Sequence, residues 1–305
     1  MTSLTHEFSE ALPAPRERVF RAFTDEAELQ CWFAQHVEVN PHAGGEYRFW
    51  GVHTQGAPLR AQATQKILRI EAPSLLAFSW KLEEADSEVT LQFSEEAAAD
   101  GASAAAADAP ATVPATVLKG RQHFPNAPQV PRALDLVDDI WRIALANLRA
   151  HLAGGSGVCL PDFSDPLPRL RQTILINAPR DRVFQALLDP AVLDPWLGAK
   201  SVVEPLVGGR YSYGWKYDVR GQQVEGGPTK ILELVEDTKL VTDWPNWRGD
   251  PDMPVQRVTW LLESVGGSTR VILIHEPFPR TADLSDYPQG WAFFLGGLKS
   301  RLESA

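Results

Sequence analysis

The sequence predicts an α+β protein of two tandem domains, each a curved antiparallel sheet wrapped around a long C-terminal helix, with two short helices after the first strand. The first observation is an internal repeat: the segment Ala14–Ala22 returns as Ala178–Ala186, 164 positions later. The second is a succession of alternating apolar and polar segments separated by turn residues, which is typical of strands. The third is an amphipathic segment with helical spacing at the end of each copy. The period is far longer than that of a solenoid, so it indicates a duplicated domain.

The two copies stay in the same register well beyond this opening segment. Each carries a tryptophan after the first helices, a Gly-Gly-x-Tyr unit, a Lys-Ile-Leu unit and a further tryptophan. The matching positions are Trp32 and Trp196, Gly44–Tyr47 and Gly208–Tyr211, Lys66–Leu68 and Lys230–Leu232, and Trp80 and Trp244.

Each copy opens with a short extended segment, 8–12 in the first and 172–176 in the second. An Ala-Pro pair follows, and proline suits the first turn of a helix because its missing N–H is not needed there. Val19, Phe20 and Phe23 then recur at helical spacing and supply one buried stripe. A second short helix is expected to run up to Trp32 or Trp196.

Strands make up the middle of each copy. The Gly-Gly pairs predict turns that lead into alternating segments. In the segment 211–217 an aromatic residue stands at every second place, which predicts that all four lie on one face of a sheet. Neighbouring strands joined by short turns are expected to pair as an antiparallel meander. The further strands are expected at 62–71, 75–81, 88–94, 115–122, 222–235, 239–244, 256–263 and 269–275.

Each copy closes with a long amphipathic helix that has a tryptophan in its first half. Its apolar residues repeat at spacings of three and four and are expected to lie against the sheet. They are Val137, Ile140, Trp141, Ala144, Leu145, Leu148 and Leu152 in the first copy, and Trp291, Phe294, Leu295, Leu298 and Leu302 in the second.

Two segments interrupt the repeat. Residues 97–115 are rich in alanine, aspartate and proline and have no counterpart in the second copy, so they are expected to form a mobile hairpin loop. Residues 154–168, which contain Gly-Gly-Ser-Gly and three prolines, are expected to link the domains. The predicted domains are therefore 1–153 and 169–305.

Composition excludes several classes of protein. The formal charge is −10 and the isoelectric point is near 5.2, which disfavours nucleic acid and membrane surfaces as partners because both require a basic face. No apolar stretch is long enough for membrane insertion, and the N-terminus lacks the pattern of a signal peptide, so a cytoplasmic location is expected. Cys31 and Cys159 do not match in the repeat, which predicts two reduced thiols.

The order of these elements, with Ala-Pro-x-x-x-Val-Phe-x-Ala, Leu-x-x-Trp and Gly-Gly-x-Tyr, resembles the SRPBCC or START-like helix-grip superfamily. The chain looks most similar to the C-terminal domain of the activator of the heat-shock-protein-90 ATPase. Supporting segments in the second copy are Lys230–Glu233, the strand Thr269–His275, and Trp291 at the closing helix. The resemblance implies a pocket between the closing helix and the concave sheet face that holds apolar ligands. It does not imply activation of the chaperone, because in the eukaryotic activator that task also uses a separate N-terminal domain with a conserved basic motif, and no segment of this sequence matches it.

Aromatic residues are the main candidates for lining such a pocket. The chain has 10 tryptophans, and several fall on the elements expected to surround the pocket. A large ring beside a cavity supplies apolar contact area, and an indole adds one N–H to orient a ligand. The alternative is that these rings simply fill the two cores. The candidate ligand-binding residues are Tyr213, Trp215, Trp244, Trp260, His275, Trp291, Phe294, Trp50, Trp80 and Trp141.

No catalytic or cofactor motif stands out. The histidines are scattered without metal-ligand spacing, and there is no nucleophile elbow, phosphate-binding loop or dinucleotide fingerprint. We therefore expect no metal, cofactor or catalytic residue. His275 ends a strand and is either an acid, base or hydrogen-bond donor at the pocket mouth or a structural histidine.

Three functions remain open. The first is a non-enzymatic protein whose helix-grip domains bind a small apolar or amphipathic molecule. The second is an enzyme of the polyketide-cyclase type, with His275, Glu276 or Tyr213 as acid–base candidates. The third is a stress-related interaction protein that acts on a chaperone. The second domain keeps the aromatic strand and His275, so ligand binding is expected there and scaffolding in the first.

Overall fold

The computed structural model describes residues 2–95, 115–155, 162–164, 168–219, 221–250, 252–284 and 287–304. The chain divides into two compact units, Met1–Val158 (unit 1) and Cys159–Ala305 (unit 2). The division falls within the segment expected to be a linker. Most of the alanine-rich segment expected to be a mobile loop lies outside the described residues, as does Cys159; Cys31 is a free, exposed thiol.

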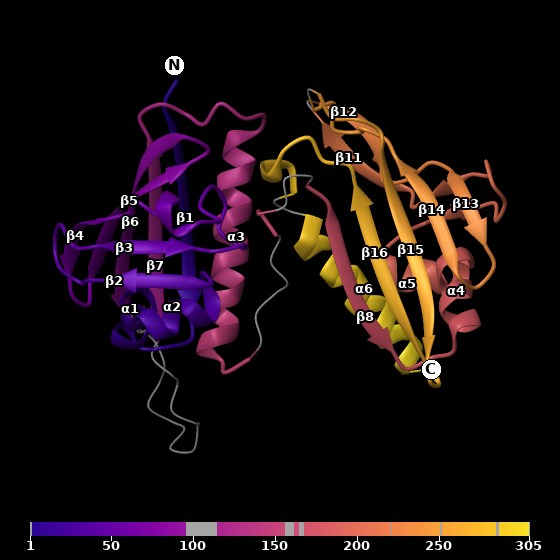
Figure 1. Cartoon of the computed structure of the whole chain (residues 1–305), viewed down its shortest axis with the longest axis horizontal. Coiled ribbons are helices and arrows are strands. Elements are labelled where there is room, and N and C mark those ends of the chain that lie inside the picture. Colours follow the sequence, from indigo (N-terminus) through magenta and orange to yellow (C-terminus); the bar gives the residue numbers. More distant parts are fainter. Residues whose placement is uncertain are drawn as a thin grey trace, which may run out of the picture. The chain divides into compact units, whose positions relative to one another are not determined.

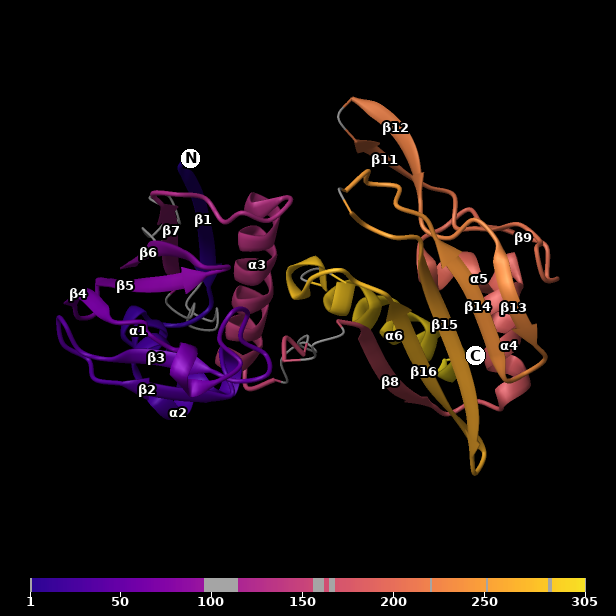
Figure 2. The same ribbon diagram turned by 45° about the horizontal axis from the view of Figure 1, so that its top comes forward.

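Unit 1 is an α+β domain with a five-stranded antiparallel sheet in the order β1-β7-β6-β5-β4 and a separate β2–β3 hairpin (Figures 1 and 2). Helix α3 packs on β1 and α2, while α1 packs on β6. The elements are β1 (Leu4–Leu12), α1 (Arg16–Thr24), α2 (Glu26–Trp32), β2 (His36–Val39), β3 (Tyr47–Trp50), η1 (Arg60–Gln62), β4 (Ile67–Glu71), β5 (Leu75–Leu82), β6 (Ala85–Glu95), β7 (Thr116–Phe124) and α3 (Ala133–Leu152).

Unit 2 repeats this plan, with the five-stranded order β8-β16-β15-β14-β13 and the small pairs β9–β10 and β11–β12. Helix α6 runs across the sheet and packs on β8 and α5. The elements are β8 (Leu170–Ile176), α4 (Arg180–Leu188), α5 (Pro190–Leu197), β9 (Val202–Val203), β10 (Tyr211–Ser212), β11 (Trp215–Val219), β12 (Gln222–Gly226), β13 (Ile231–Val235), β14 (Lys239–Trp244), β15 (Gln256–Val265), β16 (Ser268–Glu276), η2 (Thr281–Leu284) and α6 (Tyr287–Glu303). The tandem α+β helix-grip architecture expected from the repeat is confirmed.

The same buried hydrogen bonds hold the short helices of both units. The indole Nε1 of Trp32 donates to the carbonyl oxygen of Ala22 at 3.0 Å, and that of Trp196 donates to Ala186 at 3.3 Å. The hydroxyl of Tyr47 donates to the carbonyl of Phe23 at 2.7 Å, and the hydroxyl of Tyr211 donates to that of Leu187 at the same distance. Each bond satisfies a buried polar atom and ties the helices to the sheet side of the core.

The Gly-Gly pairs have a steric reason. Gly44 and Gly208 adopt φ of +81° and +82°, a region that side chains disfavour. A Cβ on Gly45 would lie 2.1 Å from the carbonyl oxygen of Asn40, and one on Gly209 would lie 2.3 Å from that of Glu204. Both positions therefore need glycine, which confirms the predicted turns.

The sheet registers show which residues correspond beyond the repeated segments. His6 pairs with Gln122 in unit 1, and Leu170 pairs with His275 in unit 2. Because His6 and Leu170 are 164 positions apart, like the other repeated residues, Gln122 and His275 occupy the same place in the two sheets. This correspondence determines how the two candidate sites compare.

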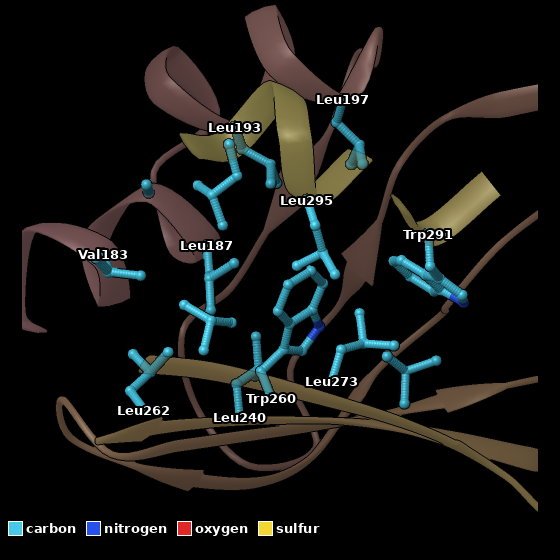
Figure 3. Packing of buried hydrophobic residues seen from close by; sticks show 14 of the residues in the cluster. Val183, Leu187, Leu193, Leu197, Leu240, Trp260, Leu262, Leu273, Trp291 and Leu295 are labelled. Atoms are coloured by element: carbon cyan, nitrogen blue, oxygen red, sulfur yellow. The ribbon is translucent and has the colours of Figure 1, made fainter. Parts of the chain in front are cut away.

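The core of unit 2 lies between the helices and one sheet face (Figure 3). Leucines of α4, α5 and α6 meet apolar side chains of β14, β15 and β16, and the indole of Trp260 rises from the sheet toward Leu295. On α6, Trp291, Leu298 and Leu302 are also buried. Burial of this apolar face, rather than helix propensity, supplies most of the stabilisation of α6.

Two sequence-based expectations are wrong. The segment 211–217 is not a single strand with its aromatic residues on one face: Gly214, with φ of +68°, separates β10 from β11. Tyr211 and Tyr213 are buried, whereas Tyr217 is 39% exposed and stacks on Trp247 at 4.6 Å. The expected strand 222–235 is likewise two strands, β12 and β13. Gly214 permits the first break and Gly227, with φ of +93°, permits the second. Between the two breaks, β11 and β12 form a hairpin.

Candidate functional site

The structure brings the predicted residues of unit 2 together around the N-terminal half of α6. Trp244, Trp260 and His275 come from adjacent strands of the sheet, Trp291 and Phe294 come from the helix, and Tyr213 and Trp215 flank the break before β11. The ring of Trp244 lies 5.0 Å from that of His275 and 5.6 Å from that of Trp291. The ring of Trp260 lies 5.6 Å from Trp291. We call Trp244, Trp260, His275 and Trp291 the ring cluster.

The ring cluster is closed to solvent. His275 and Trp260 have no exposed surface, and Trp244 and Trp291 are also buried. The rings of Phe278 and Tyr287 cover His275 from another side, at 5.0 Å and 4.7 Å. These rings form the apolar core of this half of unit 2.

Hydrogen bonding fixes the form of His275. Trp291 Nε1 donates to His275 Nδ1 at 3.2 Å. An indole N–H can only donate, so Nδ1 carries the lone pair and the proton of the neutral ring is on Nε2. His275 Nε2 is buried and has no hydrogen-bond partner. Burial, with a smaller contribution from the charge of Arg248, lowers the pKa of His275 to about 3, so the ring is neutral at physiological pH.

Unit 1 satisfies the same position with a chain of hydrogen bonds. Trp141 Nε1 donates to Gln122 Oε1 at 2.8 Å, and Gln122 Nε2 donates to Ser87 Oγ at 2.9 Å. Ser87 Oγ then donates to the carbonyl oxygen of Trp80 at 2.7 Å. All of these side chains are buried, so the chain meets the polar needs of Gln122 without solvent.

Unit 2 lacks the second half of this chain. Ser87 pairs with Trp80 across β5 and β6, and Gln256 pairs with Trp244 across β14 and β15, so Gln256 takes the place of Ser87. Gln256 Nε2 turns to the carbonyl oxygen of Pro277 at 2.9 Å instead. His275 Nε2 is therefore left as a buried donor without an acceptor, a costly arrangement unless something else supplies one.

Aromatic residues continue from the ring cluster toward the surface. Trp215 and Phe294, both half-buried, stack at 5.1 Å with an angle of 23° between their planes. Phe293, beside Phe294, is 74% exposed. Nearby, the guanidinium of Arg248 lies 4.8 Å above Trp247 and 5.5 Å above Tyr287. We call Trp215, Phe293 and Phe294 the aromatic mouth.

The predicted residues of unit 1 do not all lie together. The rings of Trp80, on β5, and Trp141, on α3, lie 5.9 Å apart. Trp50 lies on the face of β3 opposite Tyr47 and Phe49, where it stacks on His36 at 5.3 Å and lies below Arg60. Trp50 therefore does not contribute to the Trp80–Trp141 contact. A hollow of about 590 Å³ elsewhere in unit 1 is lined mainly by polar residues of β1, β6 and β7 and includes none of the predicted residues.

Sequence reasoning missed Gln122, Gln256 and Arg248. The sheet register places Gln122 where unit 2 has His275. The signal that could have found Gln122 is its place six residues after Thr116, which matches His275 after Thr269. Both threonines donate to the carbonyl oxygen after the first strand, that of Ala14 or Ala178.

Within the described part of the chain, no group of three or more histidine, cysteine or acidic residues is placed to hold a metal ion. The helices described there also include none with the length and apolarity required to cross a bilayer. The site is a buried group of aromatic rings with one unpaired imidazole N–H.

A protein-family model described as activator of Hsp90 ATPase homolog 1-like protein matches the chain twice, over residues 13–113 and 177–303. A comparison with curated proteins found no match.

Several solved structures are similar to the chain. DynU16, from the dynemicin biosynthetic locus, is 15% identical, with 97% of this chain and 98% of that one covered and a TM-score of 0.39. The Aha1 dimer from Colwellia psychrerythraea and a heat-shock-protein-90 activator from Plasmodium falciparum are each 23% identical, with 44% of this chain and 96% of theirs covered and a TM-score of 0.36. Because the family model matches most of the chain, once in each unit, the chain belongs to the family of activator of Hsp90 ATPase homolog 1-like proteins.

Proposed function

We propose that this protein is a non-enzymatic binder of a small apolar or amphipathic molecule, held in unit 2 between the N-terminal half of α6 and the sheet. The molecule contacts the ring cluster and the aromatic mouth, and His275 Nε2 gives it a polar anchor. The observation that carries the proposal is the difference between the units: the buried polar chain is complete at Gln122 and incomplete at His275.

Energetics support a ligand in unit 2 rather than unit 1. A buried donor without an acceptor costs roughly 1–3 kcal/mol, and a partner that supplies the acceptor recovers this free energy. In unit 1 Ser87 already occupies Gln122 Nε2, so a ligand there would gain nothing at that position. Unit 1 is therefore assigned a scaffolding role.

The chemistry of the site favours binding over catalysis. An acid–base residue works best with a pKa near the operating pH, whereas burial lowers that of His275 to about 3. The Nδ1 atom of His275 is already occupied by Trp291. Burial also raises the pKa of Tyr213 well above its usual value, and Glu276 is exposed on the strand end. The three candidates for polyketide-cyclase-type chemistry are thus poorly suited to proton transfer at neutral pH.

Two measurements on the full chain test the proposal. Native mass spectrometry of protein purified from its own host is expected to show a small molecule bound, and a fluorescent apolar probe is expected to bind to protein freed of it. Phe294→Ala removes half of the stacked pair at the mouth and is expected to weaken probe binding, whereas Leu134→Ala, at an exposed position on α3, is the control. Protein that carries no molecule and binds no apolar probe would refute the proposal.

A second candidate, interaction with a chaperone, is favoured by the family match. A full-length bait is expected to retain a heat-shock-protein-90 homologue from lysate if this is the function. Retention that persists in Phe294→Ala and with the probe bound would place the interaction away from the mouth. Failure to retain that homologue, alongside probe binding, would leave the ligand-binding function alone.

A further inference from the structure

Unpaired hydrogen-bond donors gather in the ring cluster. The indole Nε1 atoms of Trp244 and Trp260 are buried without a partner, as is His275 Nε2. An indole N–H only donates, and the bond from Trp291 makes His275 Nε2 a donor as well. The three donors stand on β14, β15 and β16, the adjacent central strands, and their rings all lie within about 6 Å of the Trp291 ring, at 5.6 Å, 5.6 Å and 6.1 Å. Thr242 Oγ1, also on β14, and Gln172 Oε1, on β8, are buried acceptors without a partner, and neither bonds to these three donors. Unpaired N–H donors therefore outnumber the unpaired acceptors on these strands.

From this donor set, and resting on the ligand-binding function proposed above, we infer that unit 2 selects flat aromatic molecules that carry a hydrogen-bond acceptor oxygen, as aromatic ketones do. The oxygen accepts from His275 Nε2 and from the indole N–H groups, while the ring system lies among the aromatic side chains. A hydrocarbon of the same shape leaves the donors unpaired and binds more weakly.

The corresponding positions of unit 1 do not form such a set. Leu91 takes the place of Trp260, because Leu76 pairs with Leu91 and its repeat partner Leu240 pairs with Trp260. Gln122, in the place of His275, has its amide paired. Trp80 Nε1 is unpaired there, at the place of Trp244. The donor cluster is therefore specific to the second copy.

Ring contacts favour a flat ligand. Rings follow one another from exposed Phe293 to Phe294 at 5.6 Å, then to Trp291 at 6.1 Å, and from Trp291 to His275 at 6.1 Å. At the mouth, Trp215 and Phe294 lie nearly parallel, an arrangement in which another planar ring can stack. A flat aromatic molecule that enters between these side chains can replace their ring–ring contacts with equivalent contacts of its own.

Charge near the site favours a neutral or anionic ligand over a cationic one. Arg248 lies over Trp247 and Tyr287, which itself contacts His275, and its positive charge disfavours a second cation there. The buried oxygen Oε1 of Gln172 is an unpaired acceptor on β8, the strand next to that of His275, so a donor-bearing ligand would find fewer partners than the three N–H groups offer to an acceptor. An acceptor-bearing ligand that is neutral or anionic fits, whereas an amine does not.

The test uses three probes of one shape on the full chain: acetylnaphthalene, ethylnaphthalene and aminomethylnaphthalene, compared by equilibrium titration. We expect acetylnaphthalene to bind at least tenfold more tightly than ethylnaphthalene, a difference of about 1.4 kcal/mol, and aminomethylnaphthalene to bind most weakly. Trp244→Phe and Trp260→Phe each keep a ring and remove one unpaired donor, so each is expected to reduce the difference. Trp80→Phe removes the unpaired indole N–H of unit 1 and is the matched control, expected to change nothing.

The outcomes separate this inference from the function on which it rests. Equal binding of the acetyl and ethyl probes, or a preference for the amine, overturns the acceptor preference and leaves ligand binding standing. A preference that Trp80→Phe abolishes overturns the assignment to unit 2. Binding of none of the three probes refutes both. The comparison of probes on the unaltered chain decides the matter even where a variant fails to fold.

Discussion

Replacing Gln122 by leucine breaks the hydrogen-bond chain of unit 1 at its centre. The substitution removes two buried bonds, from Trp141 Nε1 at 2.8 Å and to Ser87 Oγ at 2.9 Å. Gln122 is only 1% exposed, so water cannot replace them. The stranded N–H of Trp141 costs roughly 1–3 kcal/mol, and Ser87 Oγ, which keeps its bond to the Trp80 carbonyl, loses one bond worth about 1 kcal/mol. We therefore expect the free energy of unfolding of unit 1 to fall by about 2–4 kcal/mol in total.

Hydrogen exchange measured by mass spectrometry on the full chain suits this test, because both units contain tryptophan and optical unfolding would merge their signals. Peptides from β7 and α3 report on unit 1, and peptides from β16 and α6 serve as an internal reference. Since about 1.4 kcal/mol corresponds to a tenfold change in an equilibrium constant, slow amides of unit 1 are expected to exchange roughly 30- to 1,000-fold faster.

A double variant supplies the control. Trp141→Phe removes the indole N–H, so adding it to Gln122→Leu removes a donor that would otherwise be stranded. The double variant is expected to lose at least about 1 kcal/mol less than the sum of the two single losses. A change in exchange below threefold for Gln122→Leu, or full additivity in the double variant, would show that the chain does not contribute as argued.

Three further predictions concern the shared scaffold, a tight glycine and pH. Tyr47→Phe and Tyr211→Phe are each expected to destabilise their own unit by about 1 kcal/mol in hydrogen exchange and to leave the other unit unchanged; an effect on both units alike would contradict this. Gly120→Ala would place a Cβ 2.0 Å from Phe8 Cζ, so a loss of about 1–3 kcal/mol in denaturant unfolding is expected, partly restored by adding Phe8→Leu; an unrestored loss would point to another cause. His275, with a folded pKa of about 3 and an ordinary value of 6.5, stays neutral in the folded state while the unfolded chain takes up a proton. Its stabilising contribution is therefore complete above about pH 6.5 and is lost as the pH falls toward 3, by up to about 1.4 kcal/mol per pH unit. Between pH 7 and pH 5 the free energy of unfolding, measured by denaturant titration, is expected to fall less for His275→Gln than for the unaltered chain. The same pH dependence of the free energy of unfolding in that variant would refute the low pKa of His275.

The scaffold was predictable because its determinants are local and repeated. Trp32 and Trp196, or Tyr47 and Tyr211, stand at one fixed offset, and each pair makes the same bond to a helix carbonyl. Residue type and spacing are enough to expect such equivalence. The closing helices were predictable for the same reason, since a single apolar face must find a sheet.

The site was only partly predictable. Gln122 and His275 are 153 positions apart, not 164, because the segments between the strands differ in length, so their equivalence appears only in the sheet register. Whether the histidine has a partner depends on the side-chain direction of Gln256, which no spacing rule determines. The break at Gly214 was missed because alternation of aromatic residues outweighed a glycine whose positive φ ends the strand.

Glycine content distinguishes α6 from α3. Helix α6 contains Gly290, Gly296 and Gly297, whereas α3 contains no glycine. Gly297 lies close to the carbonyl oxygen of Trp196, where a Cβ would come within 3.0 Å, but nothing lies near Gly290 or Gly296. Each glycine costs a helix about 1 kcal/mol relative to alanine. We therefore expect α6, which packs over the ring cluster, to unwind more readily than α3. For the ligand proposed above, entry and exit would require transient unwinding of α6, so the rates of association and dissociation would be limited by this helix rather than by diffusion.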